Sequence, residues 1–163
     1  MKHLLIVALG LAGLAAPSFG YSGEWINASN GGTGSNPVYV GREGKKDVYV
    51  CRARGQTVGK LVKADGKCYI GYYGKEYAYT SYQVLQDRYG RMRFFYTSSL
   101  SDPYLVPGGI EQPNNVNLHI CRVRRGNDFI GGKMVGSTQG GTCYYGYYGK
   151  EYTAKVFEAL SDA

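Results

Sequence analysis

The chain has 163 residues, a formal net charge of +7, 25 glycines and 17 tyrosines. Beyond residue 20, no apolar stripe at helical spacing persists over three turns, which argues against a helical fold. Short runs of Tyr, Val, Ile and Phe between turn residues are typical of strands and tight turns, so the predicted fold class is all-β.

The first 20 residues are predicted to be a cleaved signal peptide. A positive charge at the second residue precedes an apolar run at 4–16, and the small residues Ser18 and Gly20 suit signal-peptidase cleavage. A membrane anchor, the alternative, needs roughly 18 or more apolar residues, and Pro17 ends the run too early. The sequence therefore predicts a secreted or periplasmic protein without a transmembrane segment.

The following residues, 21–37, contain the single tryptophan, Trp25, and a loop rich in Gly, Asn and Ser. A large ring beside a strand start favours a core position for Trp25 over the alternative of a sugar-stacking platform. Further along the chain, strands are expected at 38–40, 48–53 and 68–73, and residues 82–85 close the first repeat.

A seven-residue sequence, GYYGKEY, occurs at 71–77 and returns unchanged at 146–152. Around it, 118–123 matches 48–53, and 157–160 matches 82–85. Neither half is large enough for a confident core of its own, so the prediction is one compact domain of two pseudo-symmetric tandem repeats of antiparallel strands. The expected boundaries are a signal peptide at 1–20, a first repeat at 21–87, a connecting strand or loop region at 88–105 and a second repeat at 106–163.

The connecting stretch interleaves three arginines with five aromatic residues. Such a pattern can bind single-stranded nucleic acid, but strands with an exposed basic edge have the same sequence pattern. Because export makes a nucleic-acid partner unfavourable, the sequence predicts none. The overall basic charge is compatible with acidic glycans or anionic surfaces, or with no partner at all.

Four cysteines on an exported chain predict two disulfides, for which three pairings are possible. Cys51 matches Cys121 and Cys68 matches Cys143 in the two repeats. Duplication therefore favours the local pairs Cys51–Cys68 and Cys121–Cys143. A metal site is the weaker alternative, because the chain has no Cys-x-x-Cys pair.

Evidence for catalysis is weak. Beyond the leader the chain has one histidine, His119, which stands where the first repeat has Tyr49. Glu76 and Glu151 are candidates for the paired carboxylates of a glycosidase. Each follows a lysine and lies in a different repeat, however, so a structural ion pair with that lysine is expected. The prediction is a non-enzyme without a metal or cofactor.

A binding site needs fewer functional groups than a catalytic site. A carboxylate that accepts two hydroxyl protons and an ammonium that donates to the same oxygens can hold a vicinal diol. Each repeat offers one candidate of each kind outside the heptapeptide: Glu43 and Lys60 in the first, Glu111 and Lys133 in the second. The alternative is that these four residues are ordinary solvated charges. The heptapeptide itself is interpreted as scaffold.

The succession Glu-Trp, Val-Tyr-Val-Cys-Arg-Ala, Gly-Lys, a Cys-Tyr strand, Gly-Lys-Glu and Tyr-x-Val-Leu resembles the DM-nine repeat family. The resemblance spans about residues 24–162 and implies the architecture of the mollusc lectins of that family, which are all-β, disposed to dimerise and bind mannose. It places their sugar-binding acid at Glu43 and their lysine at Lys60 and Lys133, with Glu111 aligned only across a loop gap. The departures are Glu in place of Asp, the loss of the family's proline before the lysine, and tyrosine in place of histidine at Tyr77 and its repeat.

The functional hypothesis is a secreted, lectin-like protein with two equivalent sugar sites and glycans as partners. Its rivals are a host-interaction or defence protein that contacts proteins or anionic surfaces, and, less favoured, a glycan-active enzyme.

Overall fold

The structure, a computed structural model, describes residues 22–97, 102–137 and 140–162. The predicted signal peptide lies outside these residues. The described part is nearly all strand, as expected, with two short 3-10 helices, η1 (Lys63–Asp65) and η3 (Asp102–Tyr104). The strands of the first half are β1 (Gly23–Ser29), β2 (Tyr39–Glu43), β3 (Lys46–Ala53), β4 (Thr57–Val62), β5 (Lys67–Tyr72), β6 (Lys75–Tyr79) and β7 (Ser81–Asp87). Those of the second half are β8 (Met92–Tyr96), β9 (Pro107–Glu111), β10 (Val116–Arg125), β11 (Asp128–Val135), β12 (Thr142–Tyr147), β13 (Lys150–Ala154) and β14 (Glu158–Asp162).

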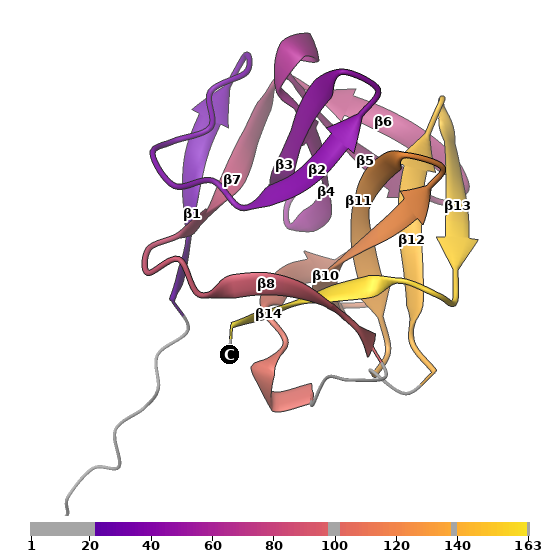
Figure 1. Cartoon of the computed structure of the whole chain (residues 1–163). Helices are drawn as coiled ribbons and strands as arrows, with labels where there is room; N and C mark the ends of the chain where they lie inside the picture. Colours follow the sequence, from indigo (N-terminus) through magenta and orange to yellow (C-terminus); the bar gives the residue numbers. More distant parts are fainter. Residues whose placement is uncertain (1–21, 98–101, 138–139, 163) are drawn as a thin grey trace, which may run out of the picture.

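The strand order is symmetric about its centre. A single curled antiparallel sheet runs β1-β7-β3-β4-β5-β6-β13-β12-β11-β10-β14-β8, while β2 pairs with β3 and β9 pairs with β10. Adding seven to each strand number of the first half gives the second half in reverse order. Figure 1 shows the two halves, indigo to magenta and salmon to yellow, curled around a common interior. The duplication seen in the sequence is thus a pseudo-twofold symmetry of the fold.

Strand β8 lies in the stretch that was expected to connect the repeats. It pairs with β14 over five residues, as β1 pairs with β7. Within this symmetry β8 is the counterpart of β1, so the pairing associates it with the second half. The ring of Phe94 on β8 accordingly packs like that of Trp25 on β1: both are partly buried against the central core.

The interior explains why the two halves form one domain. A central cluster of buried side chains combines residues of the first half, such as Val50 and Leu85, with residues of the second, such as Ile120 and Leu160. Two smaller clusters, each within one half, surround the cysteines. Because the central apolar surface is shared, an isolated repeat would expose its side of it to water.

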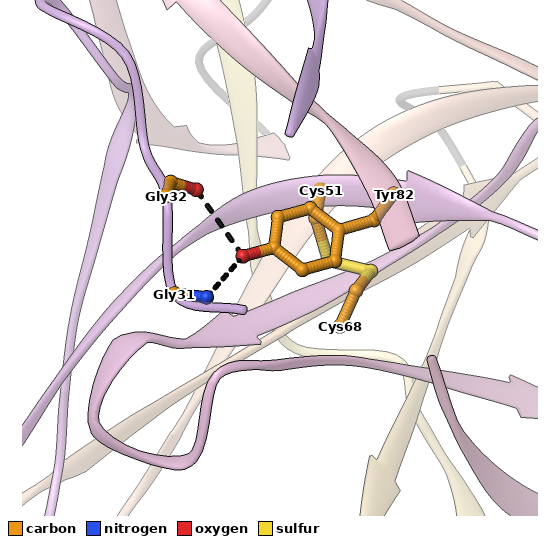
Figure 2. Close-up of a disulfide and its surroundings, with 5 residues drawn as sticks. All are labelled: Gly31, Gly32, Cys51, Cys68 and Tyr82. Atoms are coloured by element: carbon orange, nitrogen blue, oxygen red, sulfur yellow. Dashed lines mark hydrogen bonds between the residues drawn. A yellow bond between two sulfur atoms is a disulfide. The ribbon is translucent and has the colours of Figure 1, made fainter. Parts of the chain in front are cut away.

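The predicted disulfide pairing is confirmed: Cys51 bonds Cys68 and Cys121 bonds Cys143. Each bridge links the central strand of its half to the strand two places along the sheet. Figure 2 shows the first bridge beside Tyr82, whose hydroxyl accepts a bond from the Gly31 amide at 2.8 Å and donates to the Gly32 carbonyl at 3.2 Å. Burial raises the pKa of Tyr82, which keeps this hydroxyl a donor.

Among the described residues, none of the helices has the length and apolar character needed to span a membrane.

Candidate functional site

The candidate lysine of the first repeat, Lys60, lies in a strand that is otherwise apolar or small. All six residues of β4 are buried, and Lys60 is 3% exposed. Its Nζ donates to both carboxylate oxygens of Glu43, at 2.8 and 3.1 Å. A lysine is almost never fully buried unless it is paired, so this geometry favours a built charged centre over the alternative of solvated charges.

The second repeat reproduces this arrangement. Lys133 on β11 is also 3% exposed and donates to Glu111 at the end of β9, so the loop gap in the sequence alignment does not separate these two residues in space. In addition, Lys133 Nζ donates to the backbone carbonyl of Gly71 at 2.7 Å. The structure thus brings each predicted acid to its predicted lysine.

Each lysine has a second carboxylate partner, which the sequence interpretation missed. Glu76 Oε2 lies 3.5 Å from Lys60 Nζ, and Glu151 Oε2 lies 3.2 Å from Lys133 Nζ. The expectation that both glutamates pair with the preceding lysines was wrong, because adjacent residues of a strand point to opposite faces of the sheet. The available signal was the strict repetition of Gly-Lys-Glu. The two heptapeptides therefore belong to the charged centres and are more than scaffold.

The heptapeptide hairpins interlock across the pseudo-twofold axis. The Glu76 carboxylate accepts from the Gly149 amide at 3.2 Å, and the Glu151 carboxylate accepts from the Gly74 amide at the same distance. Two backbone bonds of 3.0 Å, Glu76 N to Gly149 O and Glu151 N to Gly74 O, join the same four residues. Each glutamate thus serves the lysine of its own repeat and the hairpin of the other.

The first glycine of each heptapeptide has a steric role in the contact between the two halves. A Cβ on Gly71 would lie 2.5 Å from the carboxylate of Glu151, and a Cβ on Gly146 would clash with Glu76 in the same way. Atoms at such distances overlap, so any side chain there would displace the glutamate. The repeated Gly at this position is explained by a contact with the other half of the molecule.

Two hollows open over the lysines. The first, of about 470 Å³, is lined by Lys60 and its two glutamates, by Lys46, Asp65 and Tyr69 of the same repeat, and by Asp128 and Tyr148 of the second repeat. The second, of about 270 Å³, is lined by Lys133 and its two glutamates, by Val116, Val135 and Tyr144, and by Tyr73 of the first repeat. Both hollows thus carry side chains of both repeats.

A hydrogen-bonded network borders the first hollow. Lys46 Nζ donates to Asp65 Oδ1 at 2.6 Å, and the Tyr69 hydroxyl donates to Asp65 Oδ2 at 3.0 Å. The Lys46 bond holds the pKa of Asp65 below its usual value. Burial, and next the bond to Asp65, raises the pKa of Tyr69 to about 12. At neutral pH this border therefore presents one cation, one anion and a phenol fixed as a donor.

His119 stands apart from both hollows. It lies on β10, and its Nδ1 is 3.3 Å from the carbonyl oxygen of Val106 on the neighbouring part of the chain. Within the described ranges, no group of three or more His, Cys, Asp or Glu side chains is placed to hold a metal ion.

The fold and the paired centres define a tandem-repeat β-protein with two buried charged centres, and the sequence comparison identifies the repeat of the first half. Residues 18–79 match the family model of the DM9 repeat, which confirms the resemblance over the first half of the chain. The second half reproduces its strand order and charged centre. No curated protein matches the chain in sequence.

Among solved structures, the chain is similar to the nematode sperm cell motility protein MFP2B, with a TM-score of 0.58 and 16% sequence identity. The superposition covers 86% of this chain and 46% of MFP2B, so the chain spans about half the length of that protein. At this identity the likeness concerns the fold alone.

Proposed function

We propose that the protein is a secreted carbohydrate-binding protein, lectin-like in action, and that the two hollows over Lys60 and Lys133 are its sugar sites. The observation that carries the proposal is a buried ammonium ion paired with a partly exposed carboxylate at the floor of each hollow. Glu43 keeps 21% and Glu111 18% of its side chain exposed. The remaining lone pairs of each carboxylate can accept hydroxyl protons, and the ammonium can donate to a hydroxyl oxygen.

Formal charge selects among sugars. One lysine between two glutamates leaves each centre at −1, so an anionic sugar would meet a negative floor. A neutral polyol satisfies carboxylate oxygens without bringing a charge of its own. The mannose preference implied by the family resemblance agrees with this chemistry, and it remains part of the proposal.

Secretion is proposed on two grounds: the predicted leader at 1–20, and the two disulfides, which persist in oxidising compartments. Two sites on one chain, and four in a homodimer, would raise avidity for a multivalent glycan by roughly 10²–10⁴ where the geometry permits. A homodimer is implied by the family resemblance alone.

A glycan array tests the proposal. The wild-type protein is expected to bind neutral hexose-containing glycans. Glu43→Gln combined with Glu111→Gln, which leaves each buried lysine its second carboxylate, is expected to lose that binding. Glu24→Gln, an exposed glutamate of β1 outside the charged centres, is the matched control, as Lys67→Met, an exposed lysine of β5, is for substitutions of the lysines.

Absence of binding above background, or binding unchanged in the double variant, would refute the proposal. Binding that collapses in modest salt and ignores sugar identity would favour the rival, a protein that acts on anionic surfaces. Turnover of a glycan would favour the enzyme.

A further inference from the structure

The third residue of the repeated heptapeptide is a tyrosine in an unusual state. Tyr73 and Tyr148 have φ values of +46° and +47°, and they are 73% and 84% exposed. For a bulky residue a positive φ is an outlier that costs of order 1–3 kcal/mol. Glycine would adopt this backbone at no steric cost, and an exposed ring adds little to the core. Neither packing nor local conformation therefore explains a tyrosine at both positions.

The two tyrosines lie at the hollows of the opposite repeats. Tyr148 of the second repeat lines the hollow over Lys60, and Tyr73 of the first repeat lines the hollow over Lys133. The preceding tyrosines also approach the lysine of the opposite repeat. The ring centroid of Tyr147 lies 5.6 Å from Lys60 Nζ, and that of Tyr72 lies 5.8 Å from Lys133 Nζ.

Each exposed ring is held in place from two sides. It meets the preceding ring edge-on, at 4.5 Å between the centroids of Tyr72 and Tyr73 and 4.4 Å between those of Tyr147 and Tyr148. The backbone amide of the glycine that follows each of them donates to a glutamate of the opposite centre, which holds the turn that carries the ring. A ring that is both exposed and oriented in this way is preorganised for a ligand.

A hexose needs an aromatic surface of this kind. Its hydroxyls require donors and acceptors, which the lysine and glutamates supply, while its C–H groups form an apolar face. A tyrosine offers a large rigid surface at low entropic cost, since only two χ angles are fixed on binding. The floor of each hollow is charged, so the opposite repeat supplies the exposed aromatic surface above it.

We infer that Tyr148 is the stacking platform of the first site and Tyr73 that of the second, each supplied by the other repeat. The inference rests on the proposed sugar binding and adds its specificity-determining residues. Each site then belongs to both repeats: its buried charges come from one half and its aromatic wall from the other.

Single-site proteins make the test unambiguous. Glu111→Gln weakens the second site and leaves the first, while Glu43→Gln does the reverse. Affinity is measured by calorimetry with methyl α-mannoside or, if the array selects another hexose, with the methyl glycoside of that hexose. In the Glu111→Gln protein, Tyr148→Gly should weaken binding by about tenfold, or about 1.4 kcal/mol, the size of effect expected when a contributing binding side chain is truncated. Tyr73→Gly should not weaken it. In the Glu43→Gln protein the pattern should be reversed.

Thermal unfolding separates binding from structure. Because glycine relieves the positive φ, Tyr148→Gly should keep or raise the Tm while it lowers affinity. Tyr89→Gly, at an exposed tyrosine outside both hollows, is the control for loss of a surface ring.

The outcomes distinguish the two proposals. If the wild-type protein binds no sugar, the proposed function fails, and this inference fails with it. If the wild-type protein binds and the Glu43→Gln, Glu111→Gln double variant does not, but Tyr148→Gly binds as tightly as its parent, only the stacking assignment fails. Loss at the first site on changing Tyr73 would overturn the exchange between repeats.

Discussion

The two proposed sites have the same charged floor and different borders. In the first, Glu43 is opposite Lys46 in the β2–β3 pair; in the second, Glu111 is opposite Val116 in the β9–β10 pair. The lysine that bonds an aspartate at the first hollow thus has a valine as its counterpart at the second. The second hollow is the smaller, and fewer charged side chains line it. The comparison suggests that the buried charges are fixed by the fold, since they tie the two hairpins together, while the borders are free to differ. Two sites of unequal selectivity are therefore expected, where the sequence suggested two equivalent ones.

The largest effect is expected at the buried lysines. Lys60→Met leaves two carboxylates without their cation, so the free energy of unfolding should fall by about 3–5 kcal/mol. Lys133→Met should cost about 1 kcal/mol more, because the Gly71 carbonyl also loses its donor. Urea denaturation measures both, with Lys67→Met expected within about 0.5 kcal/mol of the wild type. Equal, small losses for both variants would show that the centres do not tie the halves together.

The next effect should appear in the opposite half from the substitution. Gly71→Ala pushes Glu151 away from Lys133, so it should weaken the second site by about tenfold, the scale of one charged hydrogen bond. Gly146→Ala should do the same to the first site. Calorimetry on the single-site proteins assigns each loss, and a loss in the same half as the substitution would contradict the crossed arrangement.

A smaller effect is expected from exchanging the borders. Lys46→Val gives the first hollow the apolar border of the second, and Val116→Lys does the reverse. Each change should shift the ratio of affinities for two array hits by about threefold to tenfold, the value of one hydrogen bond. In the Lys46→Val protein, the free energy of unfolding should change by less than about 1 kcal/mol, because Lys46 is half exposed and its ion pair is a surface one. If both variants keep the wild-type order of sugars, the borders do not set selectivity.

The smallest effect is spectroscopic. The raised pKa of Tyr69 means that the folded state holds this proton more tightly than the unfolded state. Its contribution to stability is therefore present below the ordinary tyrosine pKa of about 10 and is lost as the pH rises through about 12. Asp65→Asn removes one cause and leaves burial, so the pKa should fall only part of the way. A difference titration of tyrosinate absorbance between wild type and variant should show one group shifted to lower pH, and no difference would refute the Asp65–Tyr69 bond.

Much of this protein could be read directly from the repeat. An unchanged heptapeptide with flanking matches indicated duplication, and the matched cysteines favoured the local pairing that the structure contains. The same alignment located Glu43, Lys60 and Lys133, because a duplicated strand keeps its residues in register. Local sequence was sufficient for these features, since each depends on contacts within one repeat.

Tertiary structure alone decided how the repeats combine. The sequence places Glu76 beside Lys75, yet the strand directs it to Lys60 and to the hairpin of the other half. Gly71 and Gly146 acquire their roles only there, from contacts with glutamates seventy or more positions away along the chain. Each half could be predicted from its own residues, whereas the centre between them could not, because it forms only when the two interlocked hairpins bury their charges together.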